Sequence, residues 1–139
     1  MTRKLFLDTG PLVALLDQGD FHHAWAMEQW ARVKPPLWTC EAVLSEACFL
    51  LRGLLPGPEA VLEAVHRGAI EIPFRLADHV LRVKQLMAKY SRVPMSLADA
   101  CLVCMAERHS ESVVFTMDGD FRIYRKHGRT AIPVLMPGE

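Results

Sequence analysis

The stretch Lys4-Leu5-Phe6-Leu7-Asp8-Thr9-Gly10-Pro11 decides the fold that we expect for this chain. Leu5-Phe6-Leu7 is a short apolar run of the kind found in buried strands. Gly10-Pro11 ends the strand and opens a helix, because proline in the first helical turn has no N–H to leave unpaired. Asp8 therefore lies where a buried strand ends and a helix begins. Ligands of open α/β sheets bind at that edge, so Asp8 is either a turn and cap residue or a ligand for a cation.

Length and composition limit the classes of protein to which the chain can belong. It has 139 residues, 51% of them hydrophobic, and we expect a single domain spanning residues 1–139. No apolar run reaches the roughly 18 residues of a membrane helix, and Asp8 interrupts the first run too early for a secretory signal. We therefore expect a cytoplasmic protein. The 16 basic and 16 acidic residues cancel, so any affinity for nucleic acid must come from a local site.

Strand and helix patterns alternate along the whole chain. We expect strands at 5–7, 37–39, 69–72, 113–116 and 131–135, and helices at 11–18, 21–33, 41–52, 58–66, 74–90, 96–109 and 121–124. In the helix at 74–90 we expect an inward apolar stripe of Leu76, Val80, Val83, Leu86 and Met87. The alternation predicts a parallel sheet covered on both faces, which is a three-layer α/β/α fold.

Four acidic residues occur in positions that this fold brings to one edge. Asp8 and Asp118 each follow a strand, Asp99 opens a helix, and Glu46 is expected to project from its helix among apolar side chains. Each has a structural explanation when taken alone: turn chemistry, a capping box at Ser96, or a partner arginine. Together they would repel one another strongly unless they were protonated or neutralised by a cation.

The residue types in this group select the kind of cation. Carboxylate oxygens without organised His or Cys ligands favour a hard ion, Mg²⁺ or Mn²⁺. Such an ion activates a water as a nucleophile while it holds a phosphate oxygen, which is the chemistry of phosphodiester cleavage. Asp120 lies two residues after Asp118 and either caps the helix expected at Phe121 or joins the acids.

Four segments resemble the motifs of the PIN-domain ribonucleases, in particular the VapC-type toxins of toxin–antitoxin pairs. They are Leu7-Asp8-Thr9-Gly10, Val43-Leu44-Ser45-Glu46, Leu97-Ala98-Asp99-Ala100 and Phe115-Thr116-Met117-Asp118-Gly119-Asp120-Phe121. Each motif is weak alone, but their order and spacing fit the family across almost the whole chain.

The resemblance implies a PIN-like domain with a five-stranded parallel sheet in the order 3-2-1-4-5. It implies that Asp8, Glu46 and Asp99 are metal ligands, that Asp118 or Asp120 supplies a fourth, and that the Thr116 hydroxyl orients the acids. It further implies an endoribonuclease that uses Mg²⁺ or Mn²⁺, acts on RNA, forms a homodimer and is masked by an antitoxin protein.

The roles of three other features of the sequence remain open at this point. The face formed by Ala24, Met27 and Trp30 is core, dimer surface or antitoxin groove. Basic residues that could hold phosphates lie in two places, with Lys89 and Arg92 before Asp99 and the remainder after Asp118. The latter are Arg122, Arg125, Lys126 and Arg129. Cys101 and Cys104 form a C-x-x-C inside a helical pattern, where buried thiols are the favoured interpretation.

Other functions fit less well. Asp8-Thr9-Gly10 also resembles an aspartic-protease motif, but those enzymes are β-proteins and this chain is largely helical. A phosphatase with an aspartyl nucleophile would place a second Asp where Gly10 stands, and a P-loop is absent. The main alternatives are a PIN-like module that binds RNA or protein without catalysis, and a PIN nuclease that processes RNA outside any toxin system.

Overall fold

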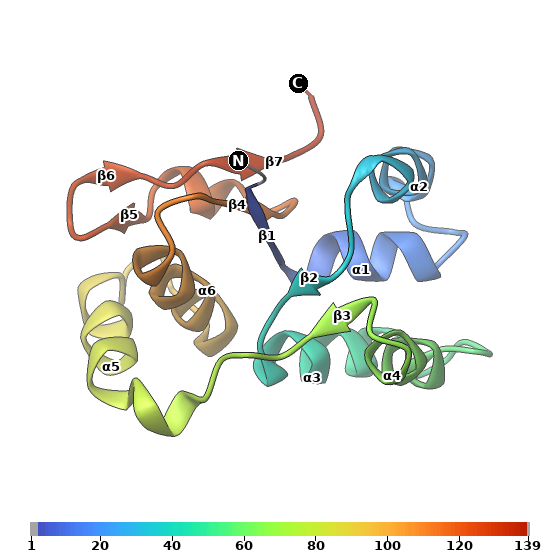
Figure 1. The fold of residues 1–139 in the computed structure, drawn as a ribbon, viewed down its shortest axis with the longest axis horizontal. Helices are drawn as coiled ribbons and strands as arrows, with labels where there is room; N and C mark the ends of the chain where they lie inside the picture. The colour runs from blue at the N-terminus through green and yellow to red at the C-terminus, as the bar shows by residue number, and fades with distance from the viewer. Residues whose placement is uncertain (1–2, 139) are drawn as a thin grey trace.

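The computed structural model describes residues 3–138, and a parallel sheet runs through its centre (Figure 1). The strands are β1 (Lys4–Leu7), β2 (Leu37–Trp38), β3 (Ile70–Glu71), β4 (Ser112–Phe115) and β7 (Val134–Leu135). They pair in the order β3-β2-β1-β4-β7, and every pairing is parallel. The five-stranded order 3-2-1-4-5 is therefore confirmed, with β7 as the fifth strand of this sheet.

Helices cover both faces of the sheet. They are α1 (Thr9–Leu16), α2 (His23–Arg32), α3 (Glu41–Leu50), α4 (Pro58–His66), α5 (Val80–Lys89) and α6 (Leu97–Arg108). Figure 1 shows α5 and α6 on one side and α1, α2 and α4 on the other. Helix α3 contacts α1, α4 and α6. The three-layer α/β/α arrangement is therefore confirmed.

Side-chain alternation along the central strands divides the core in two. Phe6 and Val114 belong to the cluster packed with α5 and α6, whereas Leu7 and Phe115 belong to the cluster packed with α1 and α4. Successive strand residues point to opposite faces. A strand with both faces buried therefore reads as a continuous apolar run, as Leu5-Phe6-Leu7 does.

The helix expected at 74–90 is shorter than predicted. A 3₁₀ turn, η1 (Leu76–Asp78), precedes α5, and His79 between them has a non-helical φ of −133°. Leu76 and Val80 are exposed, so the inward stripe begins only at Val83. The prediction failed here because an apolar residue at helical spacing need not be buried.

The second helix begins later than expected, at His23. Asp20 lies in the turn before it, where its carboxylate accepts a hydrogen bond from the N–H of His22 (2.8 Å). Ala24 and Met27 are exposed, which excludes them from the core. Trp30 packs on the Phe115 ring at a centroid distance of 5.9 Å.

The C-terminal part contains a hairpin that the strand expected at 131–135 did not anticipate. Strands β5 (Arg125–Lys126) and β6 (Thr130–Ala131) pair antiparallel, and Gly128 in their turn has a φ of +80°, which glycine adopts without strain. The short helix expected at 121–124 is the 3₁₀ turn η2 (Gly119–Arg122). Within residues 3–138, no helix combines the length and apolarity that a membrane crossing requires.

Candidate metal centre

Asp8 acts both as a cap and as part of a buried acidic group. It is the N-cap of α1, and its Oδ1 accepts the N–H of Thr9 at 2.8 Å. Its Oδ2 accepts the hydroxyl of Thr116 at 2.7 Å. The side chain is only 6% exposed. The two interpretations of this residue are therefore compatible, because each carboxylate oxygen has a separate partner.

Two threonine hydroxyls connect Asp8 to the neighbouring acidic segments. Thr116 Oγ1 also accepts the backbone N–H of Asp118 at 2.9 Å, which places the loop after β4 beside Asp8. Thr9 Oγ1 donates to Oε2 of Glu46 at 3.0 Å. Residues from β1, β4 and α3, far apart in the chain, are thereby held around one point.

Glu46 lies where its motif predicts, but not in the environment that we expected. The inward face of α3 is formed by Val43, Leu44 and Ala47. Glu46 itself is exposed and faces the acidic cavity described below. The expectation that it projects among apolar side chains is wrong, because the buried face of α3 runs through Val43, Leu44 and Ala47 and leaves Glu46 exposed.

Asp99 is oriented at both of its ends. Its backbone N–H donates to Ser96 Oγ at 3.0 Å, as the predicted capping box requires. Its Oδ2 accepts the phenol hydroxyl of Tyr124 at 2.8 Å. Tyr124 is fully buried and was not among the candidates. Sequence gives no direct signal for this contact, because it joins two residues that are 25 positions apart in different elements.

The cap of the short helical turn before Ile123 is Asp118, whereas Asp120 lies within that turn. Asp118 is the N-cap of η2, and its Oδ1 accepts the N–H of Asp120 at 2.9 Å. The helix that Asp120 was expected to cap thus begins two residues earlier, with Asp118 as its cap. Both residues are half-buried and border the same cavity.

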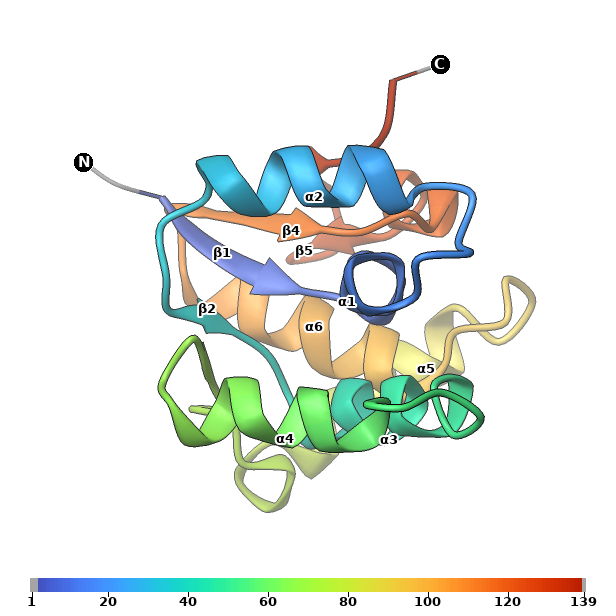
Figure 2. The ribbon, with the colours of Figure 1, turned by 90° about the vertical axis from the view of Figure 1, so that its right-hand side faces the viewer.

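All five candidate acids line one cavity of about 550 Å³ at the carboxyl edge of the sheet. The arrowheads of β1 and β4 point to this edge, beside α1, in Figure 2. Asp20 and His22, from the loop before α2, also line the cavity and were not among the candidates. The other lining residues are Thr9, Gly10, Val13, Leu50, Pro94, Ser96 and Met117.

Burial and mutual repulsion make the ionised acids costly. Burial raises the pKa of Asp8 to about 7, against the hydrogen bonds from Thr116 and Thr9 that lower it, and the charges of Asp99 and Asp118 raise it further. Burial also raises the pKa of Asp99, while the Tyr124 hydrogen bond lowers it and Asp118 raises it. The same groups would therefore be stabilised by an added positive charge.

That charge does not come from an ion pair among residues 3–138. The ion pairs there join Arg32 to Glu28, Arg75 to Asp78 and Arg82 to Glu107, all outside this cavity. The chemistry of the site, which is oxygen donors around an uncompensated negative charge, fits a hard divalent cation.

The acids do not form a closed metal cage. Within residues 3–138, no three His, Cys, Asp or Glu side chains approach closely enough to enclose an ion. The carboxylates line a wide cavity instead, so they lie farther apart than the strong mutual repulsion expected from the sequence implies. Mg²⁺ commonly keeps several waters and binds through one or two carboxylates plus a substrate phosphate, so an open acidic cavity suits it.

Comparisons with known proteins agree with this arrangement. A family model for the PIN domain matches residues 5–126. Among solved structures, VapC20 of Mycobacterium tuberculosis, described as a sarcin–ricin loop cleaving toxin, superposes with a TM-score of 0.76 at 22% sequence identity. The match covers 84% of this chain and 92% of that chain, which shows a shared fold. No curated protein matches the sequence.

The raised pKa of Asp8 predicts how the stability of the metal-free protein depends on pH. Asp8 keeps its proton to about pH 7 when folded but ionises near 3.8 when unfolded, so stability should fall as the pH rises through this window. Asp8→Asn should remove this pH dependence, which amounts to a decrease of up to about 4 kcal/mol in the free energy of unfolding. Thermal unfolding in EDTA between pH 4 and pH 8 measures it. The exposed Glu59→Gln should behave as wild type, and equal pH dependence in all three proteins would contradict the assignment.

The hydrogen bond from Tyr124 predicts a loss of metal affinity when it is removed. Tyr124→Phe keeps the ring packed against Tyr90 and Phe121 but leaves Asp99 without its donor. Calorimetric titration with Mn²⁺ should show roughly 10- to 100-fold weaker binding. Tyr90→Phe is the matched control, because its hydroxyl contacts the N–H of Arg125 and no acid. Unchanged Mn²⁺ affinity in Tyr124→Phe would refute the orienting role.

Proposed function

The chain belongs to the PIN domain family, and on that premise we propose that it is a metal-dependent endoribonuclease. The observation that carries the proposal is the convergence of Asp8, Glu46, Asp99 and Asp118 on one cavity at the carboxyl edge of the sheet. A PIN-like module that only binds RNA or protein gains nothing from several carboxylates without ion-pair partners, because such carboxylates are costly to bury. The clustering therefore favours catalysis over the non-catalytic alternative.

Each acid has a defined part in the proposed site. Asp8, Glu46, Asp99 and Asp118 would hold Mg²⁺ or Mn²⁺, with Asp120 as the replacement for Asp118 or an additional ligand. The bound ion would supply positive charge to a phosphate oxygen and acidify the attacking water. Thr116 orients Asp8 through its hydroxyl, and Tyr124 does the same for Asp99. Hydrolysis would form a bond between the water oxygen and phosphorus, break one P–O ester bond of the RNA, and leave a proton from the water for the departing RNA oxygen.

We further propose that the protein is the toxin of a type II toxin–antitoxin pair. VapC20, which shares its fold, is described as a toxin that cleaves the sarcin–ricin loop. An RNA-processing PIN nuclease outside such a system is the alternative. Arrest of growth on expression, relieved by the product of a neighbouring gene, separates the two.

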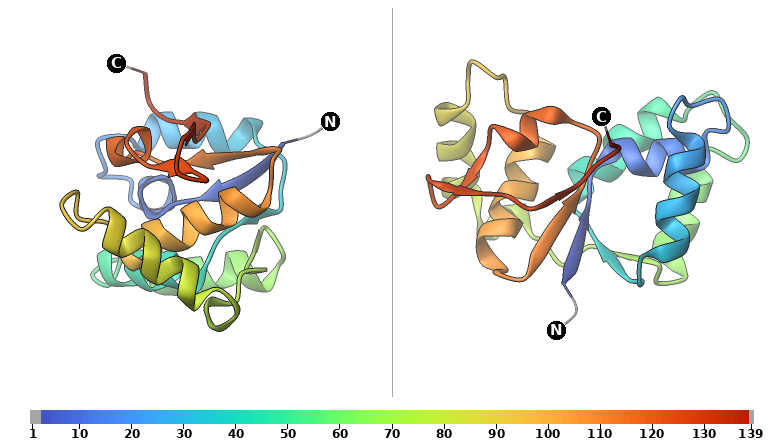
Figure 3. Two further views of the ribbon diagram at one scale, coloured as in Figure 1. Left: turned by 90° about the vertical axis from the view of Figure 1, so that its left-hand side faces the viewer. Right: turned by 90° about the horizontal axis from the view of Figure 1, so that it is seen from above.

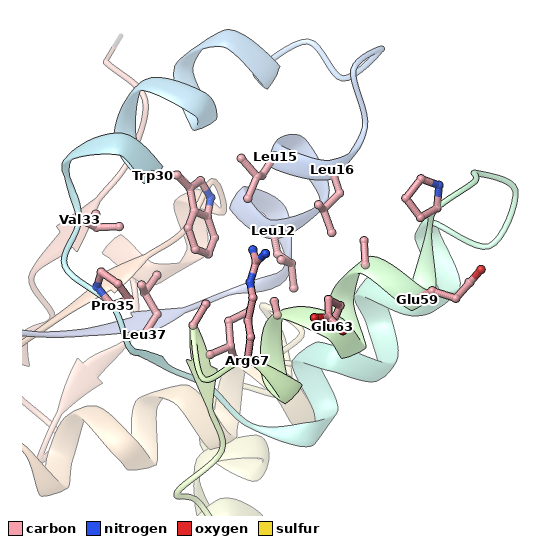
Figure 4. Close-up of a pocket in the computed structure, with 15 residues that line it drawn as sticks. Leu12, Leu15, Leu16, Trp30, Val33, Pro35, Leu37, Glu59, Glu63 and Arg67 are labelled. Carbon is pink, nitrogen blue, oxygen red and sulfur yellow. The ribbon is translucent and has the colours of Figure 1, made fainter.

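An apolar groove on the side opposite α5 and α6 supports an antitoxin partner. A hollow of about 520 Å³ is lined by α1, α2 and α4 (Figure 4). A second hollow of about 610 Å³ shares Leu15, Leu16, Pro56 and Ala60 with the first and extends to Met27. Glu59, Glu63 and Arg67 supply charge along α4. An elongated apolar channel with a charged wall fits an amphipathic helix, so we assign this surface to the antitoxin.

Exposed apolar side chains on α3, α5 and α6 support the proposed homodimer. Phe49 of α3, Val80 and Leu81 of α5, and Leu97 of α6 are each at least 41% exposed. Exposed apolar side chains of this size are candidates for contact with a second copy of the chain. These residues lie outside the antitoxin groove.

The nuclease proposal predicts metal-dependent cleavage that requires the acids. Wild-type protein should cut RNA with Mg²⁺ or Mn²⁺ and not with EDTA, and Asp8→Asn and Asp99→Asn should each be slower by roughly a hundredfold or more. Asp17→Asn is the control, because Asp17 lies at the end of α1 outside this cavity. Gel analysis of end-labelled RNA measures the rates. Cleavage by both site variants at the wild-type rate would refute the enzymatic function.

The groove assignment predicts that a charge placed in the groove weakens binding of the antitoxin. Ala60→Glu places a charge in both hollows and should weaken binding of the neighbouring-gene product about tenfold or more, while cleavage is unchanged. Leu62→Glu is the control, because Leu62 is 59% exposed on the same helix and lines neither hollow. Affinities from surface plasmon resonance compare the two. Full-strength binding to Ala60→Glu would place the partner elsewhere.

A further inference from the structure

We propose that Lys89, Arg92 and Arg129 form a phosphate-binding surface beside the acidic cavity, along which a single strand of RNA lies while its scissile phosphate enters the cavity. This inference rests on the proposed nuclease function and names the route by which the substrate reaches the site. We call these three residues the basic rim.

The rim joins two segments that are separate in the sequence. Nζ of Lys89, at the end of α5, lies 3.6 Å from the position that a Cβ would take on Gly128 in the β5–β6 turn. The N–H of Arg125 donates to the hydroxyl of Tyr90 at 3.0 Å. Figure 1 and the right panel of Figure 3 both show α5 and the hairpin at the same side of the molecule. The end of α5 and the hairpin therefore present one continuous surface.

This surface adjoins the acidic cavity. Pro94 and Ser96 line the cavity, and Arg92 precedes Pro94 by two residues. From Lys89 to Pro94 the chain can span at most about 18 Å, a reach of a few nucleotides. On the hairpin side, Tyr124 directly precedes β5 and donates to Asp99 in the cavity. A strand bound at the rim is thus within reach of the acids.

Burial separates Lys126 from the rim, and hydrogen bonds to backbone carbonyls separate Arg125 from it. Lys89, Arg92 and Arg129 are exposed. Lys126 is only 7% exposed. Nη1 of Arg125 donates to the carbonyls of Arg122, Ile123 and Tyr124, at 2.6, 3.2 and 2.9 Å. Of the basic residues expected after Asp118, Arg129 therefore joins Lys89 and Arg92 in the rim, whereas Lys126 is buried and Arg125 binds the backbone. Arg122 is exposed in η2 and is not assigned to the rim.

Charge distribution shows why an RNA nuclease of this composition needs the rim. The chain is neutral as a whole, and the acidic cavity repels phosphates. Residues 3–78 contain seven Lys and Arg against ten Asp and Glu, whereas residues 79–130 contain nine against five. Three of those five acids, Asp99, Asp118 and Asp120, line the cavity itself. The positive charge that RNA requires is thus concentrated on the side where the rim lies.

An anionic membrane or an acidic protein could use positive charge as well. RNA is favoured because the rim leads directly into a cavity whose chemistry acts on phosphodiesters, whereas neither alternative gains anything from the neighbouring acids. The experiment below separates these partners.

The test measures binding of RNA without cleavage. A short fluorescein-labelled oligouridylate is titrated in EDTA at several KCl concentrations and followed by anisotropy. The triple variant Lys89→Gln, Arg92→Gln, Arg129→Gln should bind about tenfold more weakly at low salt. Its slope of log affinity against log salt should fall by about 2, since each phosphate contact on a single strand contributes about 0.7.

A matched triple variant controls for net charge. Arg32→Gln, Lys34→Gln and Arg108→Gln remove three exposed cations from α2, the segment after α2 and the end of α6, and should change the affinity less than twofold. Unfolding temperatures verify that both triples fold. Equal effects of the two triples would overturn the rim. So would rim-dependent binding to phosphatidylserine vesicles that is tighter than binding to the oligonucleotide.

The design separates this inference from the nuclease proposal. Rim-dependent RNA binding in EDTA supports the rim even if no cleavage occurs with Mg²⁺, in which case only the nuclease proposal fails. Conversely, metal-dependent cleavage that the rim triple retains at the wild-type rate and affinity overturns the rim and leaves the nuclease proposal intact.

Discussion

A buried carboxylate, that of Asp8, is the group on which the site depends. It is held at the end of the central strand with other acids around it, and no Lys or Arg among residues 3–138 forms an ion pair with it. Burial of an isolated charge is among the most costly events in folding. The protein tolerates it through hydroxyl and backbone donors and through a pKa near neutrality. An added cation would stabilise such a group, as the proposed metal centre requires.

The same side chains that stabilise the fold also arrange the site. Asp8 and Asp118 cap helical segments, and Asp99 lies in the first turn of α6 beside its cap Ser96. Helix N-termini favour negative charge, so these positions lower part of the cost of gathering acids. Thr9 and Thr116 then link strands and helices through hydrogen bonds to the carboxylates. A substitution in this group should be expected to alter both stability and chemistry.

The sheet separates three surfaces with different tasks. The acidic cavity lies at the carboxyl edge, the apolar groove lies over α1, α2 and α4, and the basic rim lies where α5 meets the hairpin. Leu50 and Val13 line the cavity close to the helices of the groove. A partner seated in the groove would contact α1, α2 and α4, whereas RNA on the proposed rim would contact α5 and the hairpin, so the two proposed surfaces use different elements.

The sequence by itself determined the order of strands and helices and the positions of the acids at one edge. Apolar runs such as Leu5-Phe6-Leu7 and caps such as Ser96 are local signals, because hydrogen bonding and burial within a few residues produce them. Only the tertiary structure decided that Glu46 is exposed, that Tyr124 holds Asp99, and that Lys89 meets the hairpin at Gly128. These facts depend on how helices rotate and pack against distant segments, and such long-range contacts leave no periodic trace in the chain.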